Sequence, residues 1–538
     1  MSLRQPLGWS LVALLAAAAC QAPKPPPIPL LSQPPAQTLR VAVPSLPIAT
    51  DPALAPPNDS GFARIAFEAL LKPRPDLSDV QPAGAASYEV SGDGLTYTFH
   101  LQPKGAWSDG SAVRARDFLL GWQRVLDPRV NSPVGDLLAG RVGNAGDYGS
   151  LDPKKDATRI PGFLDGLGLK APDDTTFVVT LDHRSADFKW IAAIPALAPA
   201  RAQGPTAVQG PSNGPFHLVA SGKTSLTFDA NQHYWAGRPK LDQIVLSLRG
   251  DATADLARYG RGEEELTTAA ASAGAEVARD PALRAQLVQV PQLGEVWAQF
   301  NVHSAPFDNP LLRLALAEAI DRDQLVAGLG NPALPSLGPV PKGLPGSRPN
   351  LAAQRFDPAA AAATLASSGV PASALQGIKL LVRDLPADRA VATFIAAQVK
   401  AHLGVELNLD VKPSPQVSGA LQEGKFQVQA PAGWLADYAD EEDFLDLFRT
   451  ENFGQWSRYS SPGYDNLVAR ADATADPTMR LQLNAEAQQL LAEDAPVAFL
   501  YQPASWDLKQ PYVEGVTYTA LDDWPGDLFA AEISIAAH

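Results

Sequence analysis

The sequence YTFHLQPKGAWSDGSAVRARDFLLGWQRVLDP at residues 97–128 contains three local signals in close order. Tyr97 to Leu101 alternates apolar and polar side chains, which predicts a strand with one buried face. The Asp-Gly pair at positions 109–110 is typical of a tight turn. Val113 to Val125 has the spacing of an amphipathic helix, and Trp122 lies on its apolar face. The stretch therefore predicts a strand, a turn and a helix that share one core.

Strand and helix signals alternate along much of the chain. Ile378 to Val382 and Val405 to Val411 have the pattern of strands, and Ala390 to Leu403 between them has that of a helix. This order predicts a parallel strand pair and an α/β fold class. Further strands are predicted at Leu39–Val43, Thr175–Leu181, Ser225–Phe228, Ile244–Leu248, Val296–Val302 and Val497–Leu500, and further helices at Phe62–Leu71, Leu311–Ile320 and Met479–Glu493.

Length and composition limit the possible classes. With 538 residues, 46% of them hydrophobic, the chain can fill the cores of several domains. The net charge of -15 argues against nucleic-acid binding, because a phosphate-binding surface must be basic. After the first twenty residues no apolar run is long enough to cross a bilayer. The histidines show no i, i+4 pair, so neither a metal site nor a cofactor is expected.

The start of the chain has the pattern of an export signal. Arg4 precedes the apolar stretch Leu11–Ala19, so residues 1–19 are interpreted as a signal peptide. Cys20 follows directly and is the only cysteine, so it cannot form an internal disulfide. Its setting resembles the lipobox of bacterial lipoproteins, although Ala17 stands where Leu is usual. We expect cleavage before Cys20 and a lipid on its thiol; the alternative is an ordinary signal with an incidental cysteine.

The segment after the predicted lipid site is rich in proline. Residues 20–38 include QAPKPPPIPLLSQPPAQT, a composition that favours an extended and semi-rigid chain. We interpret these residues as a tether. The signal, the lipid and the tether together predict an exported protein that is anchored to a membrane, either in the periplasm or on the outer face of the cell membrane.

A second informative stretch is GWLADYADEEDF at residues 433–444. Trp434 offers a flat apolar surface, and Asp437 offers a negative charge to a ligand cation such as the amino end of a peptide. A charged hydrogen bond of this kind contributes roughly 1.5–3 kcal/mol. The alternative is structural, since Asp440 can cap a helix with an acidic first turn. The two interpretations do not exclude each other.

The block at residues 97–128 resembles the substrate-binding proteins of bacterial peptide ABC transporters, and above all their oligopeptide-binding branch. Four other stretches agree with the family in order and spacing, and the resemblance extends over residues 39 to 520. These stretches are Ser212–Phe216 (SNGPF), Asn231–Trp235 (NQHYW), Phe300–Asp323 (FNVHSAPFDNPLLRLALAEAIDRD) and Gly433–Tyr438 (GWLADY).

The resemblance implies an α/β, two-lobed periplasmic-binding-protein-like fold of type II, cluster C, with an extra domain. The two lobes are joined by crossing strands and close around the ligand. Residues 39–75, 190–295 and 508–538 would form one discontinuous domain, and residues 76–189 the extra domain of the same lobe. Residues 296–507 would form the second lobe.

The resemblance also implies a function and its residues. The protein is expected to be a monomer that captures oligopeptides and delivers them to an ABC transporter permease. In the family, the Asp of the Gly-Trp-x-x-Asp-Tyr motif holds the amino terminus of the ligand, and that residue is Asp437 here. Trp434, Leu435 and Ala436 would pair with the peptide backbone as an added strand. Asn213 and Gly214 would contribute backbone contacts from the opposite lobe.

Two features depart from the family pattern. An early acidic contact of the family would fall near Ala55 or Pro56, where no acid stands. A carboxylate-binding Arg or His before Gly433 has no counterpart that aligns, and the basic residue nearby is Lys425. The sequence therefore names no residue that would bind a ligand carboxylate.

Other functions stay open at this point. GPSNG at residues 210–214 matches the GxSxG pattern of a hydrolase nucleophile, with Ser212 as the candidate serine, but Pro211 and Pro215 disfavour the strand-turn-helix that this motif needs. Related binding proteins carry dipeptides, nickel chelates, haem or sugars, and the fold alone does not identify the ligand. A peptide sensor that signals to a receptor is a further alternative.

Three groups of residues are predicted to have structural roles. Trp107 and Trp122 are expected in the core, and the pair Tyr234-Trp235 is expected to pack at a strand end. The acidic run Glu263–Glu265 is expected to be a solvated face.

Overall fold

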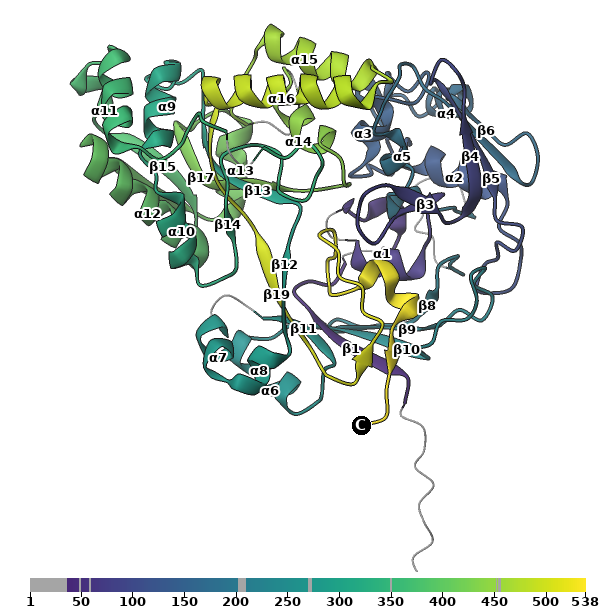
Figure 1. The fold of residues 1–538 in the computed structure, drawn as a ribbon. Coiled ribbons are helices and arrows are strands. Elements are labelled where there is room, and N and C mark those ends of the chain that lie inside the picture. Colours follow the sequence, from purple (N-terminus) through teal and green to yellow (C-terminus); the bar gives the residue numbers. More distant parts are fainter. Residues whose placement is uncertain are drawn as a thin grey trace, which may run out of the picture. The chain divides into compact units, whose positions relative to one another are not determined.

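The computed structural model describes residues 36–47, 50–57, 60–201, 210–269, 273–348, 351–450, 452 and 456–538. The predicted signal peptide, Cys20 and residues 21–35 of the predicted tether lie outside the described residues. Two large mixed sheets and one smaller sheet organise the rest (Figure 1).

The first large sheet has seven strands in the order β12-β19-β11-β1-β10-β9-β8. Central β1 runs parallel to β10 and β11, and the other neighbours are antiparallel. Leu39 and Val41 of β1 are fully buried and share a core with Phe228 and Ile244. The strands are β1 (Thr38–Val43), β8 (Phe216–Ser221), β9 (Ser225–Ala230), β10 (Gln243–Leu248), β11 (Leu266–Ala269), β12 (Leu287–Pro291) and β19 (Ala504–Lys509).

The second large sheet has six strands in the order β14-β18-β13-β17-β15-β16. Helix α12 (Pro386–Leu403) connects the parallel strands β15 and β16, so the predicted strand-helix-strand unit is confirmed. Asn309 caps α9 (Pro310–Glu318), which packs against β18 together with α10 (Arg322–Leu329). The strands are β13 (Gly294–Phe300), β14 (Leu334–Pro335), β15 (Ile378–Arg383), β16 (Leu407–Lys412), β17 (Val428–Leu435) and β18 (Val497–Gln502).

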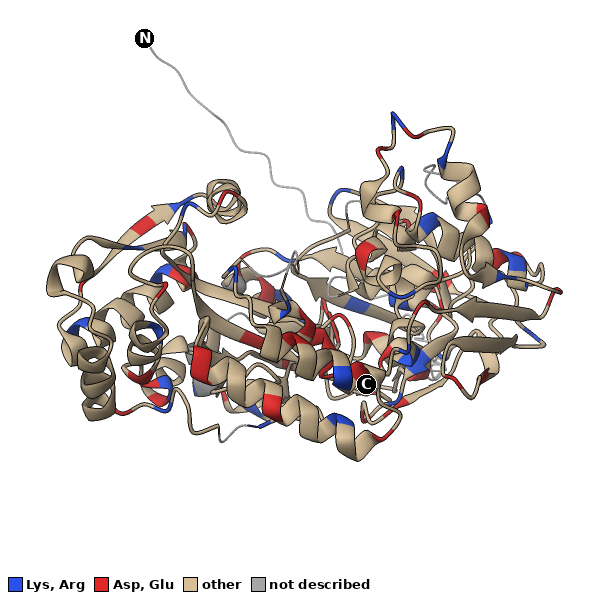
Figure 2. Ribbon diagram, turned by 90° about the horizontal axis from the view of Figure 1, so that it is seen from above, with Lys and Arg blue, Asp and Glu red and all other residues tan. Residues whose placement is uncertain are grey.

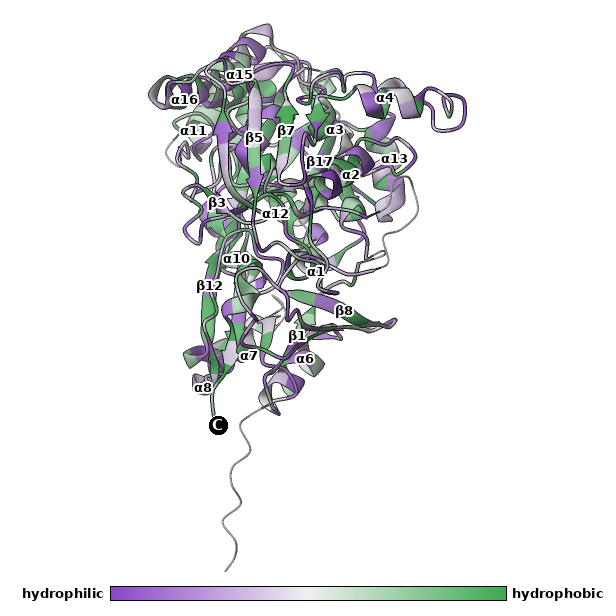
Figure 3. Cartoon of the chain, turned by 90° about the vertical axis from the view of Figure 1, so that its right-hand side faces the viewer, coloured by the Kyte–Doolittle hydropathy of each residue, from purple (hydrophilic) through white to green (hydrophobic). Residues whose placement is uncertain are grey.

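The smaller sheet has four strands in the order β4-β5-β7-β6, with bounds β4 (Ala85–Val90), β5 (Thr96–Leu101), β6 (Leu169–Lys170) and β7 (Thr176–Thr180). Strand β5 carries both hydrophilic and hydrophobic residues (Figure 3), and its side chains alternate between half-buried and buried positions. Helix α2 (Ala115–Val125) packs on this sheet through Phe118 and Trp122, both fully buried. The predicted strand, helix and core position of Trp122 are therefore confirmed, as is the burial of Trp107.

The remaining elements are further helices and short strands. They are α1 (Gly61–Ala66), β2 (Leu71–Pro73), β3 (Val80–Pro82), α3 (Gly135–Ala139), α4 (Ile160–Gly166), α5 (Phe188–Ile191), α6 (Ala252–Gly260), α7 (Gly274–Arg279), α8 (Pro281–Ala285), α11 (Pro358–Ser367), α13 (Ser414–Gln422), α14 (Glu442–Leu445), α15 (Pro462–Ala473), α16 (Pro477–Asp494), β20 (Val513–Glu514) and β21 (Ser534–Ile535).

Two neighbouring segments cross from one large sheet to the other. Strand β12 continues into β13, and β18 continues into β19; β12 pairs with β19, and β13 pairs with β18 (Figure 1). At the crossing, Gln292 N donates to Pro503 O at 3.0 Å. The Gln502 side chain donates to Gln292 O and to Lys342 O, each at 2.9 Å. The expected two-lobed fold with crossing strands is thus observed.

Two structural expectations were wrong, one on a helix and one on an acidic run. The predicted helix at Phe62–Leu71 ends at Ala66, because Glu68 N donates to Asn213 Oδ1 and Gly214 N donates to Ala66 O. These tertiary hydrogen bonds draw the chain into an extended path that helical spacing does not reveal.

The acidic run at Glu263–Glu265 is not a solvated face. Glu264 and Glu265 are buried and pair with Arg258 and Arg40, respectively. Only the first of the three glutamates is exposed. The arginines come from α6 and β1, so a sequence window could not show that the acids are compensated. By contrast, the predicted packing role of Tyr234 is confirmed, since it is buried and its hydroxyl donates to Glu68 at 2.7 Å.

A substitution in helix α2 tests how closely this part of the fold is packed. A methyl group on Gly121 would lie 2.1 Å from Ala198 O, whereas one on Gly419 of α13 would meet no heavy atom within 4 Å. We expect Gly121→Ala to lower the free energy of unfolding by about 1–3 kcal/mol through overpacking. Gly419→Ala is the matched control and should raise it by up to about 1 kcal/mol. Urea unfolding measures both, and equal stability of the two variants would contradict the packing.

Candidate functional site

The end of β17 lies beside the segments that cross between the two large sheets. Leu435 and Trp434 pair with Gly294 and Glu295 of β13, and Ala436 N donates to Leu293 O at 2.8 Å. On the other side, the ladder of β17 with β15 extends only over Val428 and Gln429 among the described residues. The last residues of β17 therefore extend beyond the part that pairs with β15, and they lie next to the crossing segments.

Asp437 lies two residues after the end of β17, and its carboxylate has no basic partner among the described residues. The side chain is half-buried, and no cation lies within 4 Å of it in the described part of the chain. Its backbone N–H donates to Asp443 Oδ2 at 2.8 Å, and the indole of Trp434 donates to the same oxygen at 3.3 Å. Burial raises the pKa of Asp437 to about 7.

The neighbouring carboxyl group of Asp443 interacts with that of Asp437. Asp443 is buried, and its pKa is raised well above the usual range, first by burial and then by the charge of Asp437. Between residues 437 and 446 the chain carries six acidic residues, and Figure 2 shows a group of acidic residues near the middle of the view. A cation placed at Asp437 would relieve this repulsion.

Asp440 has a structural role, although it is not the capping residue that the sequence predicted. The residue before α14 is Glu441, whose side chain makes no capping hydrogen bond. Asp440 Oδ1 accepts from Glu442 N at 3.0 Å at the start of α14, and the Asp440 carboxylate forms an ion pair with Arg480. Asp437 takes no part in these interactions. The two interpretations of the stretch therefore concern different residues.

Tyr438, next to Asp437, connects this segment to the part of the chain that carries the small sheet. Its hydroxyl donates to Asp187 Oδ2 at 2.7 Å, and Arg141 Nη2 donates to the same oxygen at 2.8 Å. Close by, Ala186 N donates to Asp472 Oδ1 at 3.0 Å. Tyr438 thus ties the segment of Asp437 to the loop that follows β7.

Asn213 and Gly214 use their polar groups within the fold. The Asn213 side chain accepts from Glu68 N at 3.1 Å and donates to Glu68 O at 2.7 Å. Gly214 N donates to Ala66 O at 2.9 Å, and Gly214 O accepts from Asn231 at 2.9 Å. These hydrogen bonds hold Asn213 and Gly214 next to α1. They leave the two residues little hydrogen-bonding capacity for a ligand.

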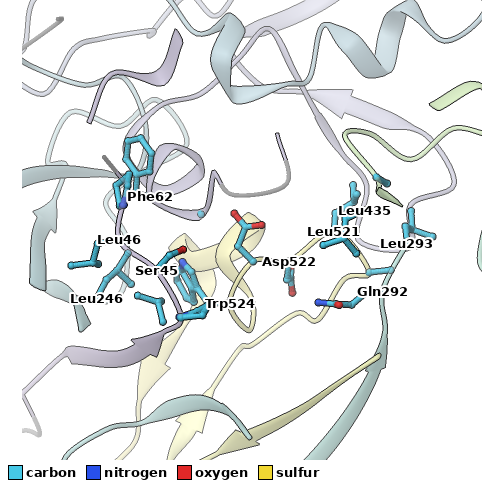
Figure 4. A pocket seen from close by; sticks show the side chains of 17 residues that line it. Ser45, Leu46, Phe62, Leu246, Gln292, Leu293, Leu435, Leu521, Asp522 and Trp524 are labelled. Atoms are coloured by element: carbon cyan, nitrogen blue, oxygen red, sulfur yellow. The ribbon is translucent and has the colours of Figure 1, made fainter. Parts of the chain in front are cut away.

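A cavity of about 220 Å³ lies beside the crossing segments, and Leu435 and Ala436 belong to its wall. Asn213 and Gly214 do not line it. Figure 4 shows Asp522 between Phe62 and Trp524 on one side and Leu521 and Leu435 on the other. The lining residues come from the loop after β1, from α1, β10, the β12–β13 connection, the end of β17 and the segment Ala520–Trp524.

Sequence reasoning missed the contribution of residues 520–524 to this cavity. The signal that was present is Asp522-Asp523 followed by Trp524, a compact acidic and aromatic group. Its placement depends on the return of the C-terminal segment to the core of the first sheet, which Trp524 and Ile535 share with Leu39 and Val41. In that segment, β20 and β21 pair in a two-stranded sheet of their own. Local patterns do not indicate that return.

Ser212 does not have the setting of a catalytic nucleophile. Its side chain is buried, and its hydroxyl donates to Phe216 O at 3.0 Å. The element that follows is strand β8 and not the helix of a nucleophile elbow. In the described residues, no group of three or more His, Cys, Asp or Glu side chains is arranged to hold a metal ion, and no helix has the length and hydropathy of a membrane span.

Comparison with known proteins identifies the family. The family described as "Bacterial extracellular solute-binding proteins, family 5 Middle" matches residues 79–456. The periplasmic oligopeptide-binding protein OppA of Salmonella typhimurium is 29% identical over 479 residues, which is 85% of this chain and 86% of that protein. The probable deoxycholate-binding periplasmic protein YgiS of Escherichia coli is also 29% identical, over 85% of this chain and 86% of that protein.

Solved structures agree in fold. The murein tripeptide-binding protein MppA of Escherichia coli aligns with a TM-score of 0.76 and 26% identity, over 93% of this chain and 99% of that chain. The family match covers more than half of the sequence, and the similar structures have the same two-lobed architecture. The chain belongs to the bacterial extracellular solute-binding proteins of family 5.

Proposed function

We propose that this protein is an exported, lipid-anchored substrate-binding protein that captures oligopeptides between its two lobes and delivers them to an ABC transporter permease. The observation that carries the proposal is the half-buried carboxylate of Asp437, which has no basic partner in the described chain and a pKa raised to about 7. A carboxylate in this state gains most from a ligand that brings a positive charge. The free amino group of a peptide is such a charge.

The end of β17 supports binding of the peptide backbone. Gly433 is exposed and lies beyond the last residue that pairs with β15. An extended peptide placed along Trp434, Leu435 and Ala436 would form main-chain hydrogen bonds, which give affinity without reading side chains. Its amino end would then meet Asp437, the next residue.

We propose a secondary role for Asn213 and Gly214. Their polar groups are engaged with Glu68, Ala66 and Asn231, so they would shape the facing wall of the site more than hydrogen-bond the ligand. Two relatives support a peptide as the ligand class, since their names state oligopeptide binding and murein tripeptide binding. The permease as the partner rests on the family resemblance.

A different ligand is the main alternative. One relative is named a probable deoxycholate-binding protein, and deoxycholate is an anion without an amino group. Asp437 and Asp443 together disfavour an anion at this position, because like charges in a half-buried site repel strongly. Dipeptides satisfy the same amine site, whereas nickel chelates, haem and sugars offer no ammonium group. A peptide sensor would use the same site.

We also propose the anchor and the domains. The small and apolar residues before Cys20 support cleavage and lipidation there, and residues 20–38 would hold the folded part away from the membrane. The first lobe would combine residues 39–75, 190–295 and 508–538 with the extra domain at 76–189. Residues 296–507 would form the second lobe. The order of strands in the two large sheets supports this division, with β19 starting a few residues before 508.

The unpaired carboxylate should reduce the stability of the unliganded protein at high pH. Asp437 has a pKa of about 7 in the folded chain, compared with about 3.9 when unfolded. The folded state therefore binds the proton more tightly and gains stability as the pH falls from about 7 towards 4. We expect Asp437→Asn to melt at a higher temperature than the wild type at pH 8, with a difference that shrinks by pH 5. A lower melting temperature of Asp437→Asn at pH 8 would contradict this account; Asp165→Asn, at an exposed position, is the control.

Peptide affinity tests the amine site. We expect Asp437→Ala to weaken peptide binding by at least about tenfold, or ~1.4 kcal/mol, while the fold survives. Wild-type affinity should also fall below pH 7, because a proton then competes with the ligand for Asp437. The measurement is calorimetry on refolded protein, after native mass spectrometry has shown which peptides copurify.

An acetylated peptide provides the control for this experiment. Blocking the amino group should weaken binding to the wild type and have little further effect on Asp437→Ala. If the variant binds free and acetylated peptides as the wild type does, Asp437 is not the amine site.

The anchor is tested by Cys20→Ser. We expect wild-type protein in the membrane fraction, with a mass that includes acyl chains on the processed N-terminus. The variant should be soluble after export, because it lacks the thiol that carries the lipid. Equal membrane association of both proteins, or a wild type without acyl mass, would refute lipid anchoring.

A further inference from the structure

One carboxylate oxygen holds both ends of the segment from Trp434 to Asp437. Asp443 Oδ2 accepts from the backbone N–H of Asp437 at 2.8 Å and from the indole N–H of Trp434 at 3.3 Å. Between these two donors lie Leu435 and Ala436, which are proposed to pair with the peptide backbone. Asp443 therefore contacts the proposed site at the first and the last residue of this segment.

The backbone around Asp443 is itself well packed. The next two residues, Phe444 and Leu445, are 1% and 0% exposed and share a core with Tyr438. Leu445 N donates to Glu441 O at 3.0 Å, which closes the turn of α14 that carries Asp443. A side chain that projects from packed backbone offers a fixed point to the groups that it binds.

The Asp437 side chain depends on its backbone for its direction. No hydrogen bond to its carboxylate is found within the described part of the chain. Strand β17 ends at Leu435, so the strand ladder does not include Asp437. The hydrogen bond from its own N–H to Asp443 is thus a direct restraint on this residue.

The charge of the pair is also compatible with a peptide amino group. Burial raises the pKa of Asp443 well above its usual range, and the charge of Asp437 raises it further. With a proton on Asp443, the two carboxyl groups carry one negative charge, which matches one ammonium group. An asparagine at position 443 would be neutral as well and would keep an acceptor oxygen.

We propose that Asp443 is a positioning residue for the amine site: its Oδ2 holds Trp434 and the backbone of Asp437, so that the Asp437 carboxylate is in place before a peptide binds. The inference rests on the proposed function and adds a residue to the same site. Asp443 acts through Asp437 and does not itself contact the ligand. Its effect is on affinity, because a group that is already held in place loses less conformational freedom on binding.

The test compares tri-alanine with N-acetyl-tri-alanine by calorimetry at pH 7.5. The ratio of the two affinities measures how well Asp437 recognises an amino group, and a general loss of stability does not change this ratio. We expect Asp443→Ala to lower the ratio at least about fivefold, because the segment must then become ordered on binding. Asp443→Asn keeps an acceptor oxygen and should stay within about twofold of the wild-type ratio.

Two further variants complete the test. Asp446→Ala removes an acid from the same stretch, where its ion-pair partner is Arg449, and should keep the wild-type ratio. Trp434→Phe keeps an aromatic ring but removes one of the two donors to Asp443, so it should lower the ratio at least about twofold. This variant decides the test if Asp443→Ala does not fold.

The outcomes separate this inference from the proposed function. An amine preference of the wild type that neither Asp443→Ala nor Trp434→Phe lowers would overturn the positioning role while the proposed function stands. A ratio in Asp443→Asn as low as that in Asp443→Ala would also overturn it. Equal binding of free and acetylated tri-alanine by the wild type would refute the amine site. Binding of neither these peptides nor penta-alanine would refute the proposed function, and the positioning role falls in both cases.

Discussion

The double crossing between the two large sheets is the constraint on which the rest of the structure depends. Strands β12 and β19 belong to one sheet and continue as β13 and β18 in the other, and the pair is held where Gln292 N donates to Pro503 O at 3.0 Å. Two adjacent antiparallel segments connect the sheets along one line. This line brings together the residues that lie beside it, among them Leu435, Ala436 and Ala520 to Trp524.

The same constraint explains why the segment that carries Asp437 is connected to both lobes. Asp437 is fixed on one side by β17, whose partner β13 is itself a crossing strand. On its other side, Tyr438 donates to Asp187 at 2.7 Å, in the loop after β7. A ligand that binds Asp437 therefore acts on a backbone that is attached to both parts. If the protein has an open and a closed state, such a ligand shifts the equilibrium between them only through contacts that differ between the two states.

Much of the fold could be predicted from local sequence. The alternation at Tyr97–Leu101, the helical spacing at Val113–Val125 and the strand-helix-strand order at residues 378–411 all correspond to observed elements, because each is decided by its own periodicity. The errors lie where distant residues decide. Glu68 is drawn out of a predicted helix by Asn213, and Glu265 is buried because Arg40 of β1 lies beside it. The cavity wall at Asp522 depends on the path of the C-terminal segment, which no local pattern encodes.

The carboxyl groups of Asp437 and Asp443 have no basic partner among the described residues, and this has a physical meaning. A protein that only needed to be stable would pair them with bases or replace them, since a buried unpaired carboxylate costs folding energy. The chain keeps both groups beside the crossing, where their pKa values are raised. Clusters of perturbed groups of this kind are typical of functional sites, where stability is lower than packing alone would allow. Under the proposed function, the missing positive charge is that of the ligand amino group.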